Sequence, residues 1–215
     1  MTIALDAMGG DFAPQAAVEG AVLAHRELKD NCELLLVGDR PAIERELSRL
    51  NVSPDTFSIH HSPDVIEMGD HPAKAFSQKP ESSIAVGFQL LKSGEAQAFC
   101  SAGNTGAMMV GAMFTVKALP GIIRPAIMGY LPKEDGRVGA LVDIGANADC
   151  KPEQLNQFAE MGAIYAECIL DIPNPKIGLL NLGEEEQKGS ILTQAAYQLL
   201  KVNSNINFIG NVEGR

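Results

Sequence analysis

The chain has 215 residues, of which 46% are hydrophobic and 20% charged, a composition typical of a globular protein rather than a disordered one. It carries 17 Lys and Arg against 27 Asp and Glu, a formal net charge of -10, with 3 Tyr, 8 Phe and no Trp. Nucleic acid is therefore not an expected partner, because its binding needs a basic surplus or aromatic side chains on which bases stack.

The four cysteines are Cys32, Cys100, Cys150 and Cys168, and they form neither a C-x-x-C pair nor, with histidines, the spacing of a zinc site. Cys32 and Cys100 adjoin apolar runs, which favours reduced thiols buried in the core and a cytoplasmic location. No basic segment precedes an apolar one at the N-terminus, and polar residues interrupt the uncharged stretch 96–116. We therefore expect neither a signal peptide nor a membrane span.

Short apolar runs alternate with segments of helical periodicity along the chain. The first half predicts a strand at 3–5, a helix at 14–28, a strand at 33–37, a helix at 41–50, a strand at 57–60 and an irregular segment at 62–80 that contains three prolines. Next come a helix at 82–92, a strand at 98–100, a helix at 104–117, strands at 126–131 and 138–144, a helix at 152–170, a strand at 177–182, a helix at 190–202 and a strand at 206–209. This alternation predicts βαβ units with a mostly parallel sheet and no interdomain linker.

Polar and glycine-rich clusters follow five of the predicted strands. They are Asp6–Asp11, Ser101–Gly106, Asp143–Asp149, Asn181–Gly189 and Gly210–Arg215. Any one of them alone is equally well explained as a turn. Ligands of parallel α/β sheets bind beyond the carboxyl ends of the strands, so five such clusters at equivalent positions favour one composite site.

The cluster Ser101–Gly106 carries the clearest chemistry. Its two glycines allow the backbone to approach a ligand, and the helix that follows presents backbone N–H groups to an anion. A helix dipole contributes only about 0.3–1 kcal/mol to a charge near its end, so a cation must assist. Lys188, Arg124 and Arg215 are the candidates. A simpler and compatible interpretation is that Asn104 or Thr105 caps the helix.

Several common motifs are absent from the sequence. There is no G-x-G-x-x-G, which counts against a nicotinamide cofactor. Gly106 and Gly111 have the glycine spacing of an ATP-binding loop, but Ala112 replaces its lysine, which counts against ATP. There is also no G-x-S-x-G elbow, so Ser101 as a covalent nucleophile is only an alternative. The histidines form no H-E-x-x-H pair, and the run Glu184–Glu186 is better explained by the positive end of the next helix than by a metal. No metal site is expected.

Seven motifs together resemble the PlsX family of bacterial phosphate acyltransferases. They are Asp6–Pro14, Ser101–Gly106, Arg124–Ala126, Asp143–Asn147, Cys150–Pro152, Asn181–Gly189 and Gly210–Arg215, in this order over the whole chain. The resemblance implies transfer of a fatty acyl group from acyl carrier protein to inorganic phosphate, which gives acyl phosphate for phospholipid synthesis and requires no cofactor. It also implies a three-layer αβα fold like that of isopropylmalate dehydrogenase and phosphotransacetylase, and a cytoplasmic homodimer associated peripherally with the membrane.

In this chemistry phosphate is the nucleophile, so the protein must bind phosphate and donate hydrogen bonds to the oxyanion. We predict that Gly103–Gly106 bind phosphate and that Lys188 or Arg215 balances its charge. The predicted catalytic residues are Asn104, Asn147, Lys188 and Asn211. The predicted substrate- and phosphate-binding residues are Asp6, Gly9, Gly10, Asp11, Ser101, Gly103, Thr105, Gly106, Asp143, Glu184, Glu213 and Arg215, with Asp143 and Glu213 orienting the asparagine donors.

Two features depart from the family pattern. The stretch Ala75–Pro80 is less basic than its equivalent in many relatives, and family members continue beyond the point where this chain stops. We therefore expect residues 1–215 to be a single α/β domain truncated on its C-terminal side, with most carrier-protein and membrane contacts in the remainder. The rival functions are a phosphotransacetylase-like enzyme acting on acyl-CoA, a decarboxylating dehydrogenase, and a noncatalytic anion- or lipid-binding scaffold.

Overall fold

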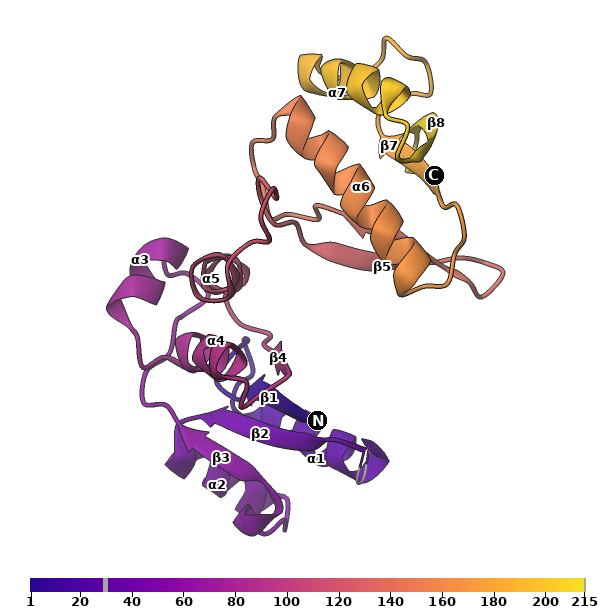
Figure 1. The fold of residues 1–215 in the computed structure, drawn as a ribbon. Helices are drawn as coiled ribbons and strands as arrows, with labels where there is room; N and C mark the ends of the chain where they lie inside the picture. Colours follow the sequence, from indigo (N-terminus) through magenta and orange to yellow (C-terminus); the bar gives the residue numbers. More distant parts are fainter. Residues whose placement is uncertain (29–30, 215) are drawn as a thin grey trace. The chain divides into compact units, whose positions relative to one another are not determined.

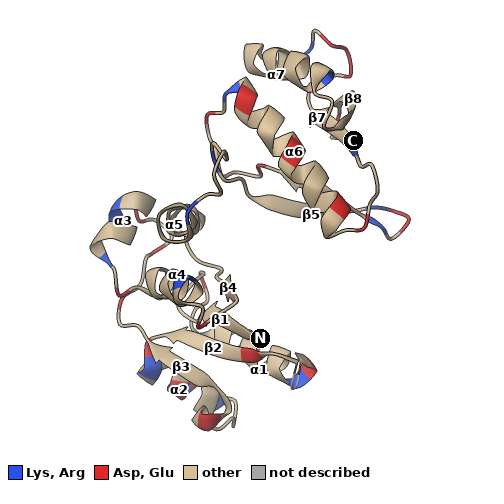
Figure 2. Cartoon of the chain, in the orientation of Figure 1, with Lys and Arg blue, Asp and Glu red and all other residues tan. Residues whose placement is uncertain are grey.

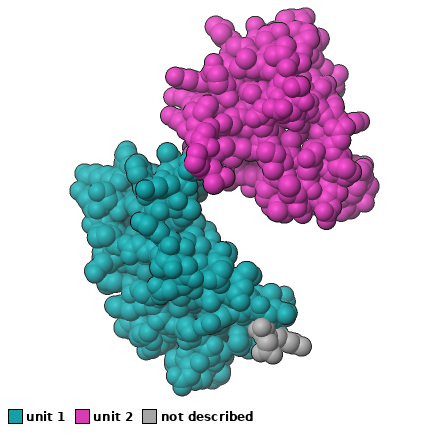
Figure 3. Space-filling model, in the orientation of Figure 1, with its two compact units in different colours: residues 1–118 teal, residues 119–215 magenta. Residues whose placement is uncertain are grey.

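The computed structural model describes residues 1–28 and 31–214, and its contacts divide the chain into two compact units. Unit 1 is Met1–Ala118 and unit 2 is Leu119–Arg215 (Figure 3). Unit 1 contains β1 (Thr2–Asp6), α1 (Gln15–Leu28), β2 (Glu33–Gly38), α2 (Arg40–Arg49), a 3₁₀ turn (Pro54–Thr56), β3 (Ser58–His61), α3 (Pro72–Gln78), α4 (Ser83–Ser93), β4 (Ala98–Cys100), α5 (Thr105–Gly111) and a π-helical turn (Ala112–Val116). Unit 2 contains β5 (Met128–Pro132), β6 (Val138–Val142), α6 (Pro152–Cys168), β7 (Lys176–Leu180), α7 (Ile191–Val202) and β8 (Asn207–Val212).

Unit 1 is built on a four-stranded parallel sheet in the order β3-β2-β1-β4. Successive residues of a strand point to opposite faces, so Leu34 and Leu36 pack against α1 and α2, whereas Val37 packs with Leu90 of α4. Helices thus cover both faces of the sheet, α1 and α2 on one and α4 on the other (Figure 1). This three-layer arrangement explains why β2 is a continuous apolar run, and it confirms the predicted α/β fold.

Unit 2 contains two smaller sheets. β5 and β6 form an antiparallel hairpin around a turn at residues 133–136, while β7 and β8 pair in parallel. α6 packs against β6, β7 and α7. A cavity of about 940 Å³ is lined by residues of β6, α6 and β7, among them Val142, Phe158 and Ile177. The hairpin is the exception within an otherwise parallel set of strands.

Three local expectations differ from the structure. The segment predicted to be irregular contains α3, which has Pro72 in its first turn, where the missing N–H costs no hydrogen bond, and which ends just before Pro80. The helix expected at 104–117 is α5 followed by a π-helical turn. Cys100 is exposed rather than buried, because β4 is a three-residue strand at the edge of the sheet, and Cys32 is half-buried.

Among the residues that the structure describes, no helix combines the length and the apolar character needed to cross a membrane.

Candidate functional site

The first two polar loops lie side by side because their strands pair. β1 and β4 are parallel neighbours, with Leu5 opposite Cys100, so the loops after Asp6 and after Cys100 leave the sheet together. The Asp6 side chain is 1% exposed, and its Oδ2 accepts a hydrogen bond of 2.7 Å from the hydroxyl of Ser101. The other carboxylate oxygen of Asp6 accepts from the backbone N–H of Met8 at 2.9 Å. One buried carboxylate therefore fixes both loops.

The hydroxyl of Ser101 is held from two sides. It donates to Asp6 and accepts a 3.0 Å hydrogen bond from the backbone N–H of Gly103. A Cβ atom on Gly9 would lie 2.4 Å from Asp6 Oδ2 and 2.8 Å from the Gly103 nitrogen, so the two loops are in backbone contact at Gly9. Asp11 and Thr105 are exposed beside this contact. The pair of loops thus brings the predicted residues of unit 1 together.

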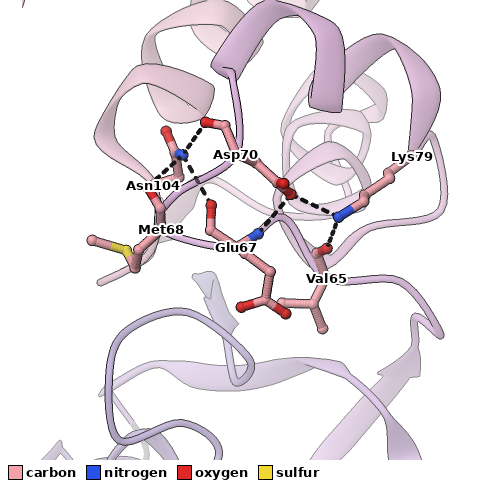
Figure 4. Close-up of polar contacts among 6 residues, drawn as sticks. All are labelled: Val65, Glu67, Met68, Asp70, Lys79 and Asn104. Atoms are coloured by element: carbon pink, nitrogen blue, oxygen red, sulfur yellow. Dashed lines mark hydrogen bonds and ion pairs between the residues drawn. The ribbon is translucent and has the colours of Figure 1, made fainter.

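Asn104 caps α5, which confirms one of the two predicted caps. Its Oδ1 accepts from the backbone N–H of Ala107 at 3.0 Å, and the side chain is 5% exposed. Its Nδ2 donates to three backbone carbonyls, those of Glu67 at 3.0 Å, Met68 at 3.3 Å and Asp70 at 3.1 Å (Figure 4). The same side chain therefore starts a helix and holds a distant turn.

In unit 2 the cluster after β6 is organised by Asp143, whose backbone φ is 66°. Asn147 Nδ2 donates to Asp143 Oδ1 at 2.8 Å and to the carbonyl of Pro125 at 3.1 Å. The thiol of Cys150 donates to Asp143 Oδ2 at 3.4 Å. Burial, together with the hydrogen bond and the negative charge of Asp143, raises the pKa of Cys150 above its ordinary value. Formation of a thiolate at Cys150 is therefore disfavoured.

The loop between β7 and α7 is fastened by two asparagines. Asn181 Nδ2 donates to the carbonyl of Lys188 at 3.1 Å and to Asn211 Oδ1 at 3.2 Å. Asn211, which is 6% exposed, donates in turn to the carbonyl of Glu185 at 2.8 Å. Asn211 lies inside β8 rather than in the loop after the strand, because β8 extends to Val212. The side chain of Lys188 is exposed in the loop so formed.

The explanation offered for Glu184–Glu186 from the sequence is wrong. α7 begins only at Ile191, with Ser190 as its cap, so the acidic run is not at the start of the helix. Glu186 instead binds side chains from the far end of α7, with Lys201 Nζ at 3.0 Å and Gln198 Nε2 at 2.7 Å. These contacts hold the pKa of Glu186 below its ordinary value.

The predicted residues fall into separate groups in the two units. Unit 1 assembles Asp6, Gly9, Gly10, Asp11, Ser101, Gly103, Asn104, Thr105 and Gly106 on two adjoining loops. Unit 2 pairs Asp143 with Asn147, and it contains Glu184 and Lys188 in the β7–α7 loop, Asn211 in β8 and Glu213 directly after β8. Arg215 lies outside the described residues. The union of these groups in one composite site stays a prediction.

Two residues that shape these loops, Asp70 and Lys79, were not identified from the sequence. Asn181 was identified only as the first residue of a polar cluster, and the structure places it directly after β7, where its side chain fastens the loop. No sequence pattern marks Asp70 and Lys79, whose side chains form an ion pair although they are nine residues apart in the chain. Within the described parts of the chain, no group of three or more His, Cys, Asp or Glu side chains is arranged to hold a metal ion.

Comparison with known proteins gives the same family over the full chain. The family model described as "Fatty acid synthesis protein" matches residues 1–215. The chain is 50% identical over 215 residues to a phosphate acyltransferase of Pelotomaculum thermopropionicum, covering 100% of this chain and 61% of that protein. It is 50% identical over 213 residues to a phosphate acyltransferase of Desulforamulus reducens, covering 99% of this chain and 62% of the relative. The chain therefore spans about three fifths of the length of these relatives.

The fold is shared with solved structures of low sequence similarity. A phosphotransacetylase from Streptococcus pyogenes matches with a TM-score of 0.69 at 19% identity, covering 99% of this chain and 68% of that one. This likeness confirms the phosphotransacetylase-like α/β fold that the resemblance implied.

Proposed function

Because the chain belongs to the fatty acid synthesis protein family, we propose that it transfers an acyl group from a thioester to inorganic phosphate and releases acyl phosphate. In the finer form of the proposal the donor is acyl-acyl carrier protein and the product enters phospholipid synthesis. The protein works as a cytoplasmic homodimer, peripherally bound to the membrane. The two relatives described above are named phosphate acyltransferases, which supports phosphate as the acceptor of the acyl group.

The observation that carries the proposal is the pair of glycine loops in unit 1. Gly9 lies against Gly103, and Asp6 and Ser101 fix the backbone of both loops. The first residues of α5, beginning at Thr105, carry backbone N–H groups that have no acceptor within a helix, and such groups bind phosphate oxygens. A loop fixed in this way suits phosphate, which must be bound and oriented so that one of its oxygens can attack the thioester.

Several side chains that could act as nucleophiles in a covalent mechanism are engaged in other contacts. The hydroxyl of Ser101 is held between Asp6 and Gly103, and the raised pKa of Cys150 disfavours its thiolate. His61 accepts a hydrogen bond from the backbone N–H of Arg40 at the start of α2, and the ring of His25 in α1 packs edge-on against Phe57. Both imidazole rings therefore have structural contacts. This favours direct attack by phosphate over a covalent acyl-enzyme.

In the proposed step an oxygen of phosphate attacks the carbonyl carbon of the thioester and forms a C–O bond. The carbonyl electron pair moves onto oxygen, and the C–S bond then breaks as that pair returns. The thiolate leaves with the bonding electrons and takes up a proton. Acyl phosphate and a free thiol are the products, and no oxidant or cofactor is consumed. Hydrogen-bond donors aimed at the oxyanion lower the barrier, and removing one such donor typically costs about 10²–10³ in rate.

The three asparagines proposed as catalytic residues now take a more specific role. Both Nδ2 hydrogens of Asn147 are directed at Asp143 and Pro125, and the Nδ2 groups of Asn104 and Asn211 donate to loop carbonyls. We therefore propose that all three position the loops, and that backbone N–H groups and Lys188 contact the substrate. Lys188 or Arg215 is the cation that balances the charge of phosphate.

The charge pattern bears on the proposed carrier-protein partner. α6 carries Glu153, Glu160 and Glu167 at seven-residue intervals, the three red bands along this helix in Figure 2. Residues seven apart share one face of a helix. Acyl carrier protein is strongly acidic, so we propose that it docks away from this face of α6.

The rival functions are separated by one comparison of donors. The protein in its natural full-length form is incubated with phosphate and either palmitoyl-acyl carrier protein or palmitoyl-CoA, and acyl phosphate is trapped with hydroxylamine. We expect product from the carrier-protein thioester only. Product from CoA alone would indicate the phosphotransacetylase alternative, and product from neither would support a noncatalytic scaffold. Binding of a nicotinamide cofactor would favour the dehydrogenase.

A further inference from the structure

The segment between β3 and α4 is tied together by one lysine. Lys79 Nζ donates to the carbonyl of Val65 at 2.7 Å and to Asp70 Oδ2 at 2.7 Å (Figure 4). The same oxygen of Asp70 accepts from the backbone N–H of Glu67 at 3.0 Å. These contacts hold the pKa of Asp70 below its ordinary value, so the carboxylate is charged at neutral pH. Lys79 and Asp70 thus set the shape of the turn 67–70.

This turn is the one that Asn104 holds. Its three carbonyls, from Glu67, Met68 and Asp70, converge on Asn104 Nδ2. The other end of the Asn104 side chain caps α5 at Ala107. The position of the turn therefore determines where the Asn104 side chain lies and hence how its Oδ1 caps α5.

A second contact joins the same segment to the start of α5. A Cβ atom on Gly106 would lie 2.3 Å from Pro72 Cγ, so the first turn of α3 touches the loop at a glycine. The turn 67–70 and α3 flank the first residues of α5, and Lys79 follows the end of α3. Movement of this segment would be transmitted to Gly103–Gly106.

We propose that Lys79 is a positioning residue for the phosphate loop, acting through Asp70 and the turn 67–70 on Asn104. The inference rests on the proposed function, since it assigns Gly103–Gly106 to phosphate. Lys79 differs in role from Lys188, because its ammonium group is committed to a carbonyl and a carboxylate rather than to a ligand.

The exposure of the pair predicts a local effect rather than unfolding. The side chains of Lys79 and Asp70 are 34% and 33% exposed, and ion pairs of this exposure contribute little to global stability. Loss of Lys79 should therefore leave the chain folded while loosening the turn and the loop. Because the loop is proposed to bind phosphate, loosening it should weaken the binding of phosphate.

The test uses Lys79→Met, Lys79→Arg and Asp70→Asn, with Lys74→Met as the matched control. Lys74 is an exposed lysine of α3, so its replacement removes the same charge from the same segment. In the natural full-length protein we expect Lys79→Met and Asp70→Asn to raise the KM for phosphate about tenfold, with kcat and the KM for the acyl donor nearly unchanged. Lys79→Arg should restore the wild-type KM, and Lys74→Met should leave it unchanged.

Amide hydrogen exchange provides a readout that does not depend on activity. In Lys79→Met the peptides covering 65–70 and 101–107 should exchange about tenfold faster, while those of β1 and β2 stay protected. Unchanged exchange at 101–107, an equal effect of Lys74→Met, or a uniform loss of protection across unit 1 would each overturn the proposal. If the wild-type protein makes no acyl phosphate, the proposed function fails, and the exchange result still decides whether Lys79 positions the loop.

Discussion

Replacement of Asn104 tests whether one side chain both caps α5 and holds the turn 67–70. A lost N-cap costs about 1 kcal/mol, within a range of about 0.5–2. The two Nδ2 hydrogens are shared by three carbonyls, and two neutral hydrogen bonds contribute about 0.5–1.5 kcal/mol each. Because the side chain is 5% exposed, little water is available to replace these partners. Asn104→Ala should therefore destabilise this part of unit 1 by about 2–4 kcal/mol.

Asn104→Ser separates the two contributions, because serine retains a capping oxygen but has no amide group. It should lose only the turn, about 1–3 kcal/mol. Thr105→Ala is the matched control, since Thr105 is the exposed neighbour that was the other candidate cap. Native-state hydrogen exchange of the α5 amides gives the opening free energy directly. The reasoning fails if Asn104→Ala changes that free energy by less than about 0.5 kcal/mol, or if Thr105→Ala has the larger effect.

Three further predictions concern the loops and the charges. Gly9→Ala should destabilise unit 1 by about 1–3 kcal/mol in denaturant unfolding, because the new methyl group would meet Asp6 and the Gly103 backbone. Gly20→Ala is the control and should be neutral or stabilising, because Gly20 lies in α1 with open space around it. Equal effects of the two substitutions would contradict the contact between the loops. Lys188→Met should raise the KM for phosphate about tenfold. Lys176→Met, which removes an exposed lysine from β7, should leave this KM unchanged. A wild-type KM in Lys188→Met would show that Lys188 does not contact phosphate. Lys79 lowers the folded-state pKa of Asp70, so the stabilisation of the turn by this pair is present above the ordinary pKa of 3.8 and is lost as the pH falls through the lower folded-state value. The local opening free energy of residues 65–70, measured by hydrogen exchange, should therefore drop more steeply in acid for the wild type than for Asp70→Asn. Identical slopes would contradict the assigned ion pair.

Features set by short-range chemistry were predictable from the sequence. β2 is a continuous apolar run that ends at a glycine, so the strand was evident from the sequence. Asn104 was identified as a candidate cap because the side chain of a capping residue bonds to an N–H group only three residues away. The loops carrying Asp6 and Ser101 were expected together because parallel strands end at the same edge of a sheet.

Features set by distant partners were not predictable. Asn104 contacts carbonyls 34 to 37 residues earlier in the chain, and no local pattern announces that contact. Glu186 was assigned to the start of a helix because its long-range partner Lys201 could not be seen in the sequence. Cys100 was expected to be buried because its strand is apolar, but its exposure depends on β4 lying at the edge of the sheet. These differences arise from tertiary pairing, which periodicity does not encode.

The most direct test of the central claim follows thiol release and ³¹P resonances together in the natural full-length protein supplied with acyl-acyl carrier protein. With phosphate present, we expect free thiol and acyl phosphate to appear in equal amounts. Without phosphate, we expect no thiol, because in the proposed mechanism phosphate is the nucleophile and no side chain forms an acyl intermediate. A stoichiometric burst of thiol in the absence of phosphate, or thiol release without an acyl phosphate resonance, would contradict the proposed mechanism.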